Sequence, residues 1–257
     1  MNSPSSTRPQ SERSDQTRAR ILDAAVCEFS QNGLAGARTE QIAEAAGVNK
    51  ALLYYYFKSK DALYAAALES IAEGVRASSL AVLDAPGSAG ERFLRSALDH
   101  FDRIYTNWRF QSMIQQEMVR LHRGEEHALT PLVETVFKPL TARLQEVLSE
   151  GVASGELIAV DPSQIRYSAL GANVFYFLSA PMIRLITGTD PLERGNLEAR
   201  RTLTVEFLGQ SIFTDREHGA RVAARVLAST PMPAHGGVRP RPTPELHPKN
   251  TVKVRHL

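Results

Sequence analysis

The segment from Thr39 to Lys60, TEQIAEAAGVNKALLYYYFKSK, constrains the fold of this chain more than any other part of it. Two short helical stretches lie on either side of Gly47, and glycine tolerates the left-handed backbone that a tight turn needs. Thr39 and Asn49 stand where these helices start, and both residue types cap the free N–H groups of a first turn. The segment therefore predicts a helix-turn-helix whose second helix reads DNA.

The second of these helices has two different faces. At about 100° per residue, its apolar and aromatic side chains divide so that one face can pack on the two preceding helices; that face holds Leu53, Tyr56 and Phe57. The opposite face offers hydroxyl groups, a cation and a small residue, from Tyr54, Tyr55, Lys58 and Ala51. Exposed tyrosines that merely cover the core are the alternative, but such a face suits phosphate oxygens and thymine methyls better.

Helical periodicity continues through the rest of the chain, and no sustained strand alternation occurs. We expect helices over 15–31, 39–47, 49–57, 59–83, 91–107, 110–122, 130–151, 163–186, 196–213 and 216–228. Pro139 should kink one of them, and Pro181 should bend or break another. The fold class predicted is all-α, with a three-helix head at 15–62 and a larger helical body at 63–229. The proline-rich or polar ends, 1–14 and 230–257, are expected to be disordered.

Composition limits the cellular setting. Cys27 is the single cysteine, so no intrachain disulfide can form, and a lone cysteine is more often a bystander than a redox sensor. No apolar signal segment is evident near Met1. The uncharged stretch between Arg166 and Arg184 contains Asn173, and it favours a helix buried between helices or subunits over a membrane span. We expect a cytoplasmic protein with no membrane partner.

From Ile21 through Tyr64 the chain resembles the DNA-binding domain of the TetR family of bacterial transcription regulators. The matching elements are ILDAA…F…NG, TEQIAEAAGV and NKALLYYYFKSKDALY, in order and at matching spacing. Asn49 stands where serine is commoner, and both residues cap helices. By this resemblance the residues that face operator DNA are Thr39, Lys50, Ala51, Leu52, Tyr54, Tyr55 and Lys60, with Tyr56 secondary.

The body resembles that family only in layout. The resemblance implies a homodimer formed by the last two major helices, over 163–186 and 196–213. Close approach would use Gly171, Ala172, Ser179 and Ala180, and apolar contacts would come from Leu203, Phe207, Leu208 and Ile212. It also implies a ligand pocket between residues 91 and 177, with candidate lining residues Phe101, Tyr105, Trp108, Met113, Met118, Phe137, Asn173 and Tyr176. The same residues would also suit a plain core.

These features are compatible with three functions to different degrees. The leading hypothesis is a repressor that a small, lipophilic or aromatic ligand releases from double-stranded operator DNA, although some relatives of this type are activators or need a corepressor. The second is an architectural DNA-binding protein with a filled body. The third is a helical enzyme, which is disfavoured because no nucleophile elbow, phosphate loop or dinucleotide fingerprint is present. No metal site and no cofactor are predicted. The basic tail from Thr230 is more often a solvated end than a DNA contact.

Overall fold

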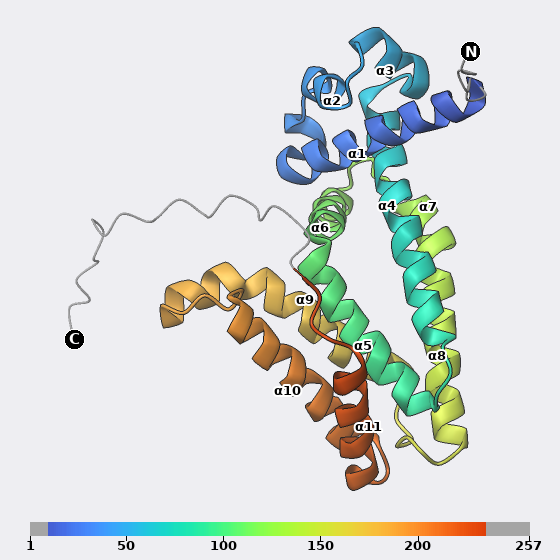
Figure 1. Ribbon diagram of the computed structural model, residues 1–257, viewed down its shortest axis with the longest axis vertical. Helices are drawn as coiled ribbons and strands as arrows, with labels where there is room; N and C mark the ends of the chain where they lie inside the picture. The colour runs from blue at the N-terminus through green and yellow to red at the C-terminus, as the bar shows by residue number, and fades with distance from the viewer. Residues whose placement is uncertain (1–9, 235–257) are drawn as a thin grey trace, which may run out of the picture.

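The computed structural model describes residues 10–234 of the chain, and within that range the protein is built from helices without a strand. The only extended pairing in the described part is an isolated bridge between Leu157 and Phe213. The prediction of an all-α protein with a small head and a larger body is confirmed (Figure 1). The predictions for residues 1–9 and 235–257 lie outside the described residues.

The head lies at one end of the long axis and consists of α1 (Gln10–Gly36), α2 (Thr39–Ala45) and α3 (Lys50–Phe57) (Figure 1). Its core is formed by fully buried apolar side chains from all three helices, among them Ile21, Phe29, Ile42 and Leu53. Burial of each such side chain stabilises the fold by roughly 1.5–3 kcal/mol. This packing holds α3 in a fixed orientation within the head.

The first helix differs from its prediction at both ends. It begins at Gln10, so residues 10–14 are helical rather than part of a disordered arm. The Ser14 Oγ lies 3.0 Å from the Tyr56 hydroxyl, which joins this extension to α3. At the other end Gly33 adopts a φ of +67°, as expected for a glycine that interrupts a helix, and helical backbone resumes until Gly36.

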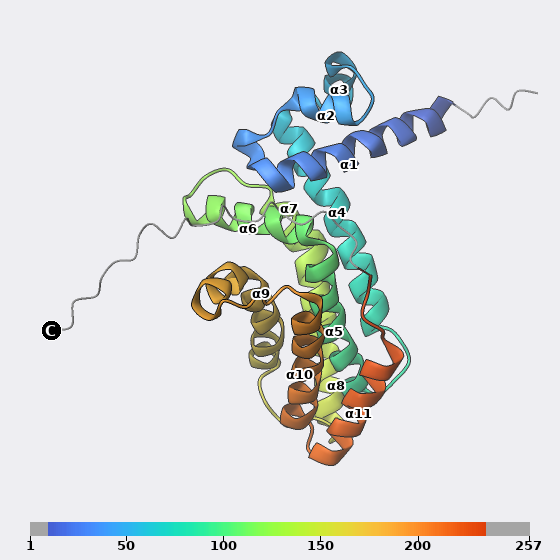
Figure 2. The same cartoon turned by 60° about the vertical axis from the view of Figure 1, so that its left-hand side comes forward.

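The body hangs from α4 (Lys60–Leu83), which leaves the head and runs down one side (Figure 1). Its first turns belong to the head core through Leu63, Tyr64 and Leu68, so the predicted boundary at 62/63 falls inside one continuous helix. Beside α4 lie α5 (Ala89–Thr106), α6 (Trp108–His122) and α8 (Lys138–Ala153). The helices α9 (Pro162–Thr187), α10 (Arg194–Ile212) and α11 (Arg216–Ser229) cover the other side of α5 (Figure 2).

The two prolines inside the predicted body helices have different effects. Before Pro139 the chain forms α7 (Leu129–Leu132) and a π-helical turn (Val133–Phe137), and α8 then starts at Lys138. Pro139 therefore sits in a first turn, where its missing N–H costs nothing. Pro181 lies within α9, which continues as helix on both sides of it, so, of the expected bend or break, the break does not occur.

The body core lies between α5, α8, α10 and α11, and it corrects part of the predicted dimer surface. Leu208 and Ile212 are buried in this core, against Phe93 and Val222 among others, because they lie on the inner face of α10. Ser179 and Ala180 are likewise buried within the chain. These four side chains therefore stabilise the monomer itself, whereas Leu203 and Phe207 remain exposed.

Candidate DNA-binding and ligand-binding sites

The turn of the helix-turn-helix has the geometry that its sequence predicts. Gly47 has a φ of +65°, in the left-handed region that favours glycine. The Asn49 side chain accepts a hydrogen bond of 2.8 Å from the Leu52 N–H and so caps α3. Leu53 and Phe57 are buried against the head, so the opposite face of α3 points outward.

Four of the predicted DNA contacts lie on this outward face: Lys50, Ala51, Leu52 and Tyr55. The Tyr55 side chain is 70% exposed, which is unusual for a tyrosine without a partner. The Lys58 ammonium lies 5.6 Å from its ring centroid and adds a second cation to the face. Lys50 forms an ion pair with Glu40, which raises the lysine pKa and lowers the carboxyl pKa. A phosphate that approached Lys50 would therefore compete with Glu40.

The other predicted DNA contacts are engaged within the head. Thr39 is buried, and its hydroxyl lies 3.3 Å from that of the half-buried Tyr54. The Lys60 ammonium donates a 3.2 Å hydrogen bond to the Ala35 carbonyl. In this conformation these three side chains form hydrogen-bonding contacts within the head, and DNA contact by them stays a prediction.

The body contains a cavity of about 360 Å³ between α4, α5, α6, α8 and α9. Its wall is mainly apolar, with residues such as Ile104, Ile114, Phe137, Leu140 and Val174. A second cavity of about 330 Å³ adjoins it. The two share four wall residues, Ile104, Gln111, Gln115 and Leu178. Together they have the size and the largely apolar character of small-molecule sites.

Half of the predicted ligand-binding residues line these cavities. Met118 and Phe137 line the first, and Tyr105 and Trp108 line the second. The Trp108 indole nitrogen is buried without a hydrogen-bond acceptor among the described residues. A buried donor in this state costs about 1–3 kcal/mol.

The remaining four predicted residues do not line either cavity. Phe101 and Tyr176 pack together in a small aromatic cluster, because both face the space between α5 and α9. Met113 is fully buried in the head core. Asn173 is also fully buried, and its side-chain nitrogen donates a 3.0 Å hydrogen bond to the Ala97 carbonyl oxygen. Size and polarity alone did not distinguish these packing residues from cavity residues.

Sequence reasoning missed the basic side chains of the first cavity, which are His100, Arg103 and Arg166. Burial, helped by the Arg103 charge, lowers the pKa of His100 to about 4, so its imidazole is neutral near pH 7. Arg103 belongs to α5, but its guanidinium donates two hydrogen bonds to α4: one of 3.3 Å to the Val75 carbonyl oxygen and one of 3.0 Å to the Ser78 hydroxyl oxygen. It also pairs with Asp99.

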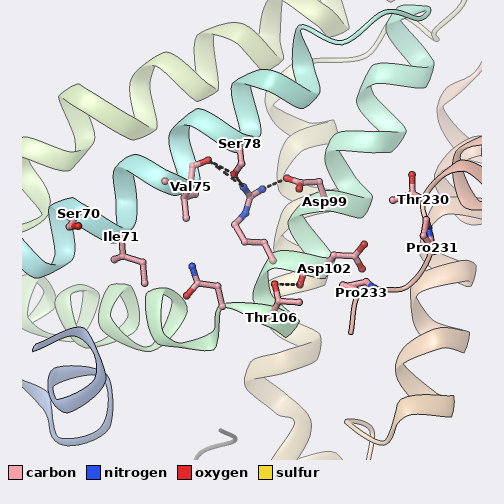
Figure 3. Close-up of a pocket in the computed structure, with 13 residues that line it drawn as sticks. Ser70, Ile71, Val75, Ser78, Asp99, Asp102, Thr106, Thr230, Pro231 and Pro233 are labelled. Atoms are coloured by element: carbon pink, nitrogen blue, oxygen red, sulfur yellow. Dashed lines mark hydrogen bonds and ion pairs between the residues drawn. The ribbon is translucent and has the colours of Figure 1, made fainter. Parts of the chain in front are cut away.

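Figure 3 shows the outer side of this connection, where Val75 and Ser78 of α4 face Asp99 of α5. An open groove of about 580 Å³ lies there, and its wall includes Thr230 and Pro231 from the segment after α11. The spacing of Asp99 and Arg103 indicates a helical ion pair, but the bonds to α4 depend on tertiary structure. Within residues 10–234, no group of three or more His, Cys, Asp or Glu side chains is placed to hold a metal ion.

These features define a DNA-binding head joined by α4 to a helical body with an internal cavity. Residues 21–67 match the family of bacterial regulatory proteins named tetR, and residues 91–208 match the tetracyclin repressor-like C-terminal domain. The chain belongs to the TetR/AcrR family of transcriptional regulators.

Individual relatives agree with this assignment. The HTH-type transcriptional regulator RutR of Escherichia coli (strain K12) is 34% identical over 177 residues, which cover 65% of this chain and 77% of the relative. A crystal structure of a TetR/AcrR-family regulator from Thermobifida fusca superposes with a TM-score of 0.56 at 26% identity, over 74% of this chain and 95% of that one. A Saccharomonospora viridis regulator in complex with choline has a TM-score of 0.63 at 18% identity, over 80% and 100% of the chains, and so shows the fold alone.

Proposed function

We propose that this regulator is a repressor, which binds an operator as a homodimer and leaves it when a small molecule fills the body cavity. The observation that carries the proposal is the position of the cavity against α4, a helix that continues from the cavity wall into the head. The outward face of α3, with Lys50, Tyr55 and Lys58, would enter the major groove. Because such proteins act on DNA, we propose a cytoplasmic location.

The dimer is proposed to form through α9 and α10. An apolar stripe at helical spacing runs along α9 and is exposed in the monomer, with Phe175, Leu178, Met182 and Leu185 among its members. Phe207 of α10 is 68% exposed. By length and composition α9 is also apolar enough to cross a membrane. Only 22% of its most apolar stretch is buried within the monomer. We propose that a second copy of the chain, rather than a membrane, covers this apolar stripe, because two heads that bind one operator together bind it more tightly than one.

Arg103 provides a route from the cavity to the head. It lines the cavity, and its guanidinium holds the last turns of α4 through Val75 and Ser78. A ligand that displaces this side chain would free α4 from α5. From Ser78 to Lys60 the helix rises about 27 Å, so a small tilt at the cavity becomes a larger shift of the head. The ligand must bind the shifted state more tightly than the DNA-binding state.

An architectural DNA-binding protein remains the second candidate, and it would need a filled body. The two cavities in the body favour ligand control instead. A broad compound screen in which no molecule raises the melting temperature or weakens operator binding would favour the architectural function.

The direct test is binding of the purified protein to the DNA upstream of its own coding region, over a range of salt concentrations. We expect saturable binding to a short palindrome, weaker binding for Tyr55→Ala, and for Lys50→Ala a log–log salt slope reduced by about 1. Lys138→Ala is the matched control, because Lys138 forms a similar exposed ion pair, with Glu134, in the body. Equal binding by all four proteins, seen only at low salt, would contradict DNA reading by α3.

A further inference from the structure

The charged residues of the body cavity are of one sign. Its wall includes two arginines, Arg103 and Arg166, and no aspartate or glutamate. Arg103 is neutralised by Asp99, which lies on the outer side of α5. Arg166 forms no ion pair with any carboxylate in the described part of the chain. The cavity therefore holds one cation without a counter-ion.

Arg166 lies beside the Thr141 hydroxyl and the Tyr167 ring, whose centroid is 4.9 Å from the guanidinium carbon. Its guanidinium donates a 2.9 Å hydrogen bond to the Thr141 hydroxyl oxygen, across from α9 to α8. Thr141 accepts this bond, so its own hydroxyl proton is free for a further acceptor. Arg166 has four other N–H donors, and a planar guanidinium matches the two oxygens of a carboxylate. His100 cannot supply a second charge, because it is neutral near pH 7.

Apolar side chains extend from Arg166 along one wall of the cavity. The wall residues on α9 follow one face of that helix, from Arg166 through Leu170 and Val174 to Leu178. The twelve steps along the helix from Arg166 to Leu178 correspond to a rise of about 18 Å. Beyond Leu178 the second cavity begins, and its wall, which includes Trp108, contains no charged residue. Charge is therefore confined to the first cavity, and the wall of the second consists of neutral side chains.

We infer that the effector is an amphipathic monoanion, a small organic acid whose carboxylate binds Arg166 and Thr141 and whose apolar part extends toward Trp108. This inference rests on the proposed ligand control of the same cavity. A volume of about 360 Å³ holds roughly a dozen non-hydrogen atoms at the ~30 Å³ that one water molecule occupies in the liquid. Decanoic acid has this size and serves as the probe.

The experiment compares decanoate, 1-decanol and decylamine at pH 7.4, below their aggregation concentrations. Trp108 is the only tryptophan of the chain and lines the adjoining second cavity, so its fluorescence reports a ligand whose apolar end reaches that cavity. We expect decanoate to bind at least tenfold more tightly than decanol, as expected for one charge-assisted hydrogen-bonded pair. Arg166→Gln should weaken decanoate binding tenfold or more and leave decanol within about threefold.

Arg184→Gln is the matched control, because Arg184 lies on the same helix, is exposed, and lines neither cavity. Circular dichroism establishes that each variant is folded, and Arg166→Lys should restore part of the preference for the acid. The inference is overturned if decanol or decylamine binds as tightly as decanoate, if Arg166→Gln binds decanoate normally, or if none of the three probes binds. Operator binding is measured in parallel: if decanol rather than decanoate releases the DNA, ligand control stands and only the ligand class is wrong.

Discussion

Replacement of Arg103 by methionine should loosen α4 from α5 without emptying the core, because methionine keeps the apolar stem and removes the guanidinium. The variant loses the 3.0 Å bond to Ser78, the longer 3.3 Å bond to Val75, and the ion pair with Asp99. It also leaves Asp99 unpaired in a site where burial already raises the pKa of that carboxyl. The side chains of this ion pair are only 15% and 31% exposed, so solvent screening of the loss is partial.

Hydrogen bonds to charged groups contribute about 1.5–3 kcal/mol each, and partial exposure and the long Val75 bond reduce the sum. We expect Arg103→Met to cost about 2–4 kcal/mol of unfolding free energy. For a chain of this size that is a fall in Tm of roughly 4–16 °C. The assay is thermal unfolding at one fixed protein concentration, because a dimer gains stability with concentration. Hydrogen exchange should also accelerate at amides around Ser78.

Arg76→Met is the matched control, since Arg76 lies on α4 and forms an exposed ion pair with Glu73 that contributes little. A double-mutant cycle with Ser78→Ala isolates the contact between the helices, and we expect a coupling of about 0.5–1.5 kcal/mol. The reasoning is refuted if Arg103→Met is no more destabilising than Arg76→Met, or if the cycle shows no coupling. In either case Arg103 would not connect the cavity with α4.

Three further outcomes are expected. His100→Gln should remove a pH dependence of the unfolding free energy, because the folded pKa of His100, about 4, lies below the usual ~6.5. In the wild type the contribution of the neutral His100 to stability is present above pH 6.5 and is lost as the pH falls toward 4, by up to about 3 kcal/mol. Denaturant unfolding from pH 7 to 4 measures the difference between the variant and the wild type. Gly219→Ala should destabilise the protein by about 1–3 kcal/mol or more, because a Cβ at Gly219 would lie 1.9 Å from the Gly209 carbonyl oxygen of α10. Gly195 has open space around it, so Gly195→Ala should be neutral or stabilising in the same thermal assay. Phe207→Glu should convert the dimer to monomers in analytical ultracentrifugation and weaken operator binding, and an unchanged sedimentation coefficient would exclude this face.

The sequence by itself determined the class of fold and the reading head. The Asn49 cap, the glycine turn and the spacing of apolar residues are local signals, each set by a few neighbouring residues, so they predicted α2, α3 and the α4 start nearly to the residue. The expected cap at Thr39 was wrong, because Arg38 holds the N-cap position of α2 and its side chain makes no capping hydrogen bond. The same local logic placed Leu53 and Phe57 inward and Tyr55 outward. It was less accurate at the start of α1, where the hydrogen bond from Ser14 to Tyr56 joins residues far apart in the chain.

Only the tertiary structure decided which apolar residues line a cavity and which fill the core. Trp108 and Phe101 are both aromatic residues of the same region, yet the first lines a cavity and the second packs against Tyr176. Similarly, Leu203 and Leu208 share α10, but one is exposed and the other buried. Burial is a property of what lies opposite a side chain, and those neighbours come from distant helices. For the same reason no local pattern could show that Arg103 reaches α4 or that Arg166 lacks a carboxylate.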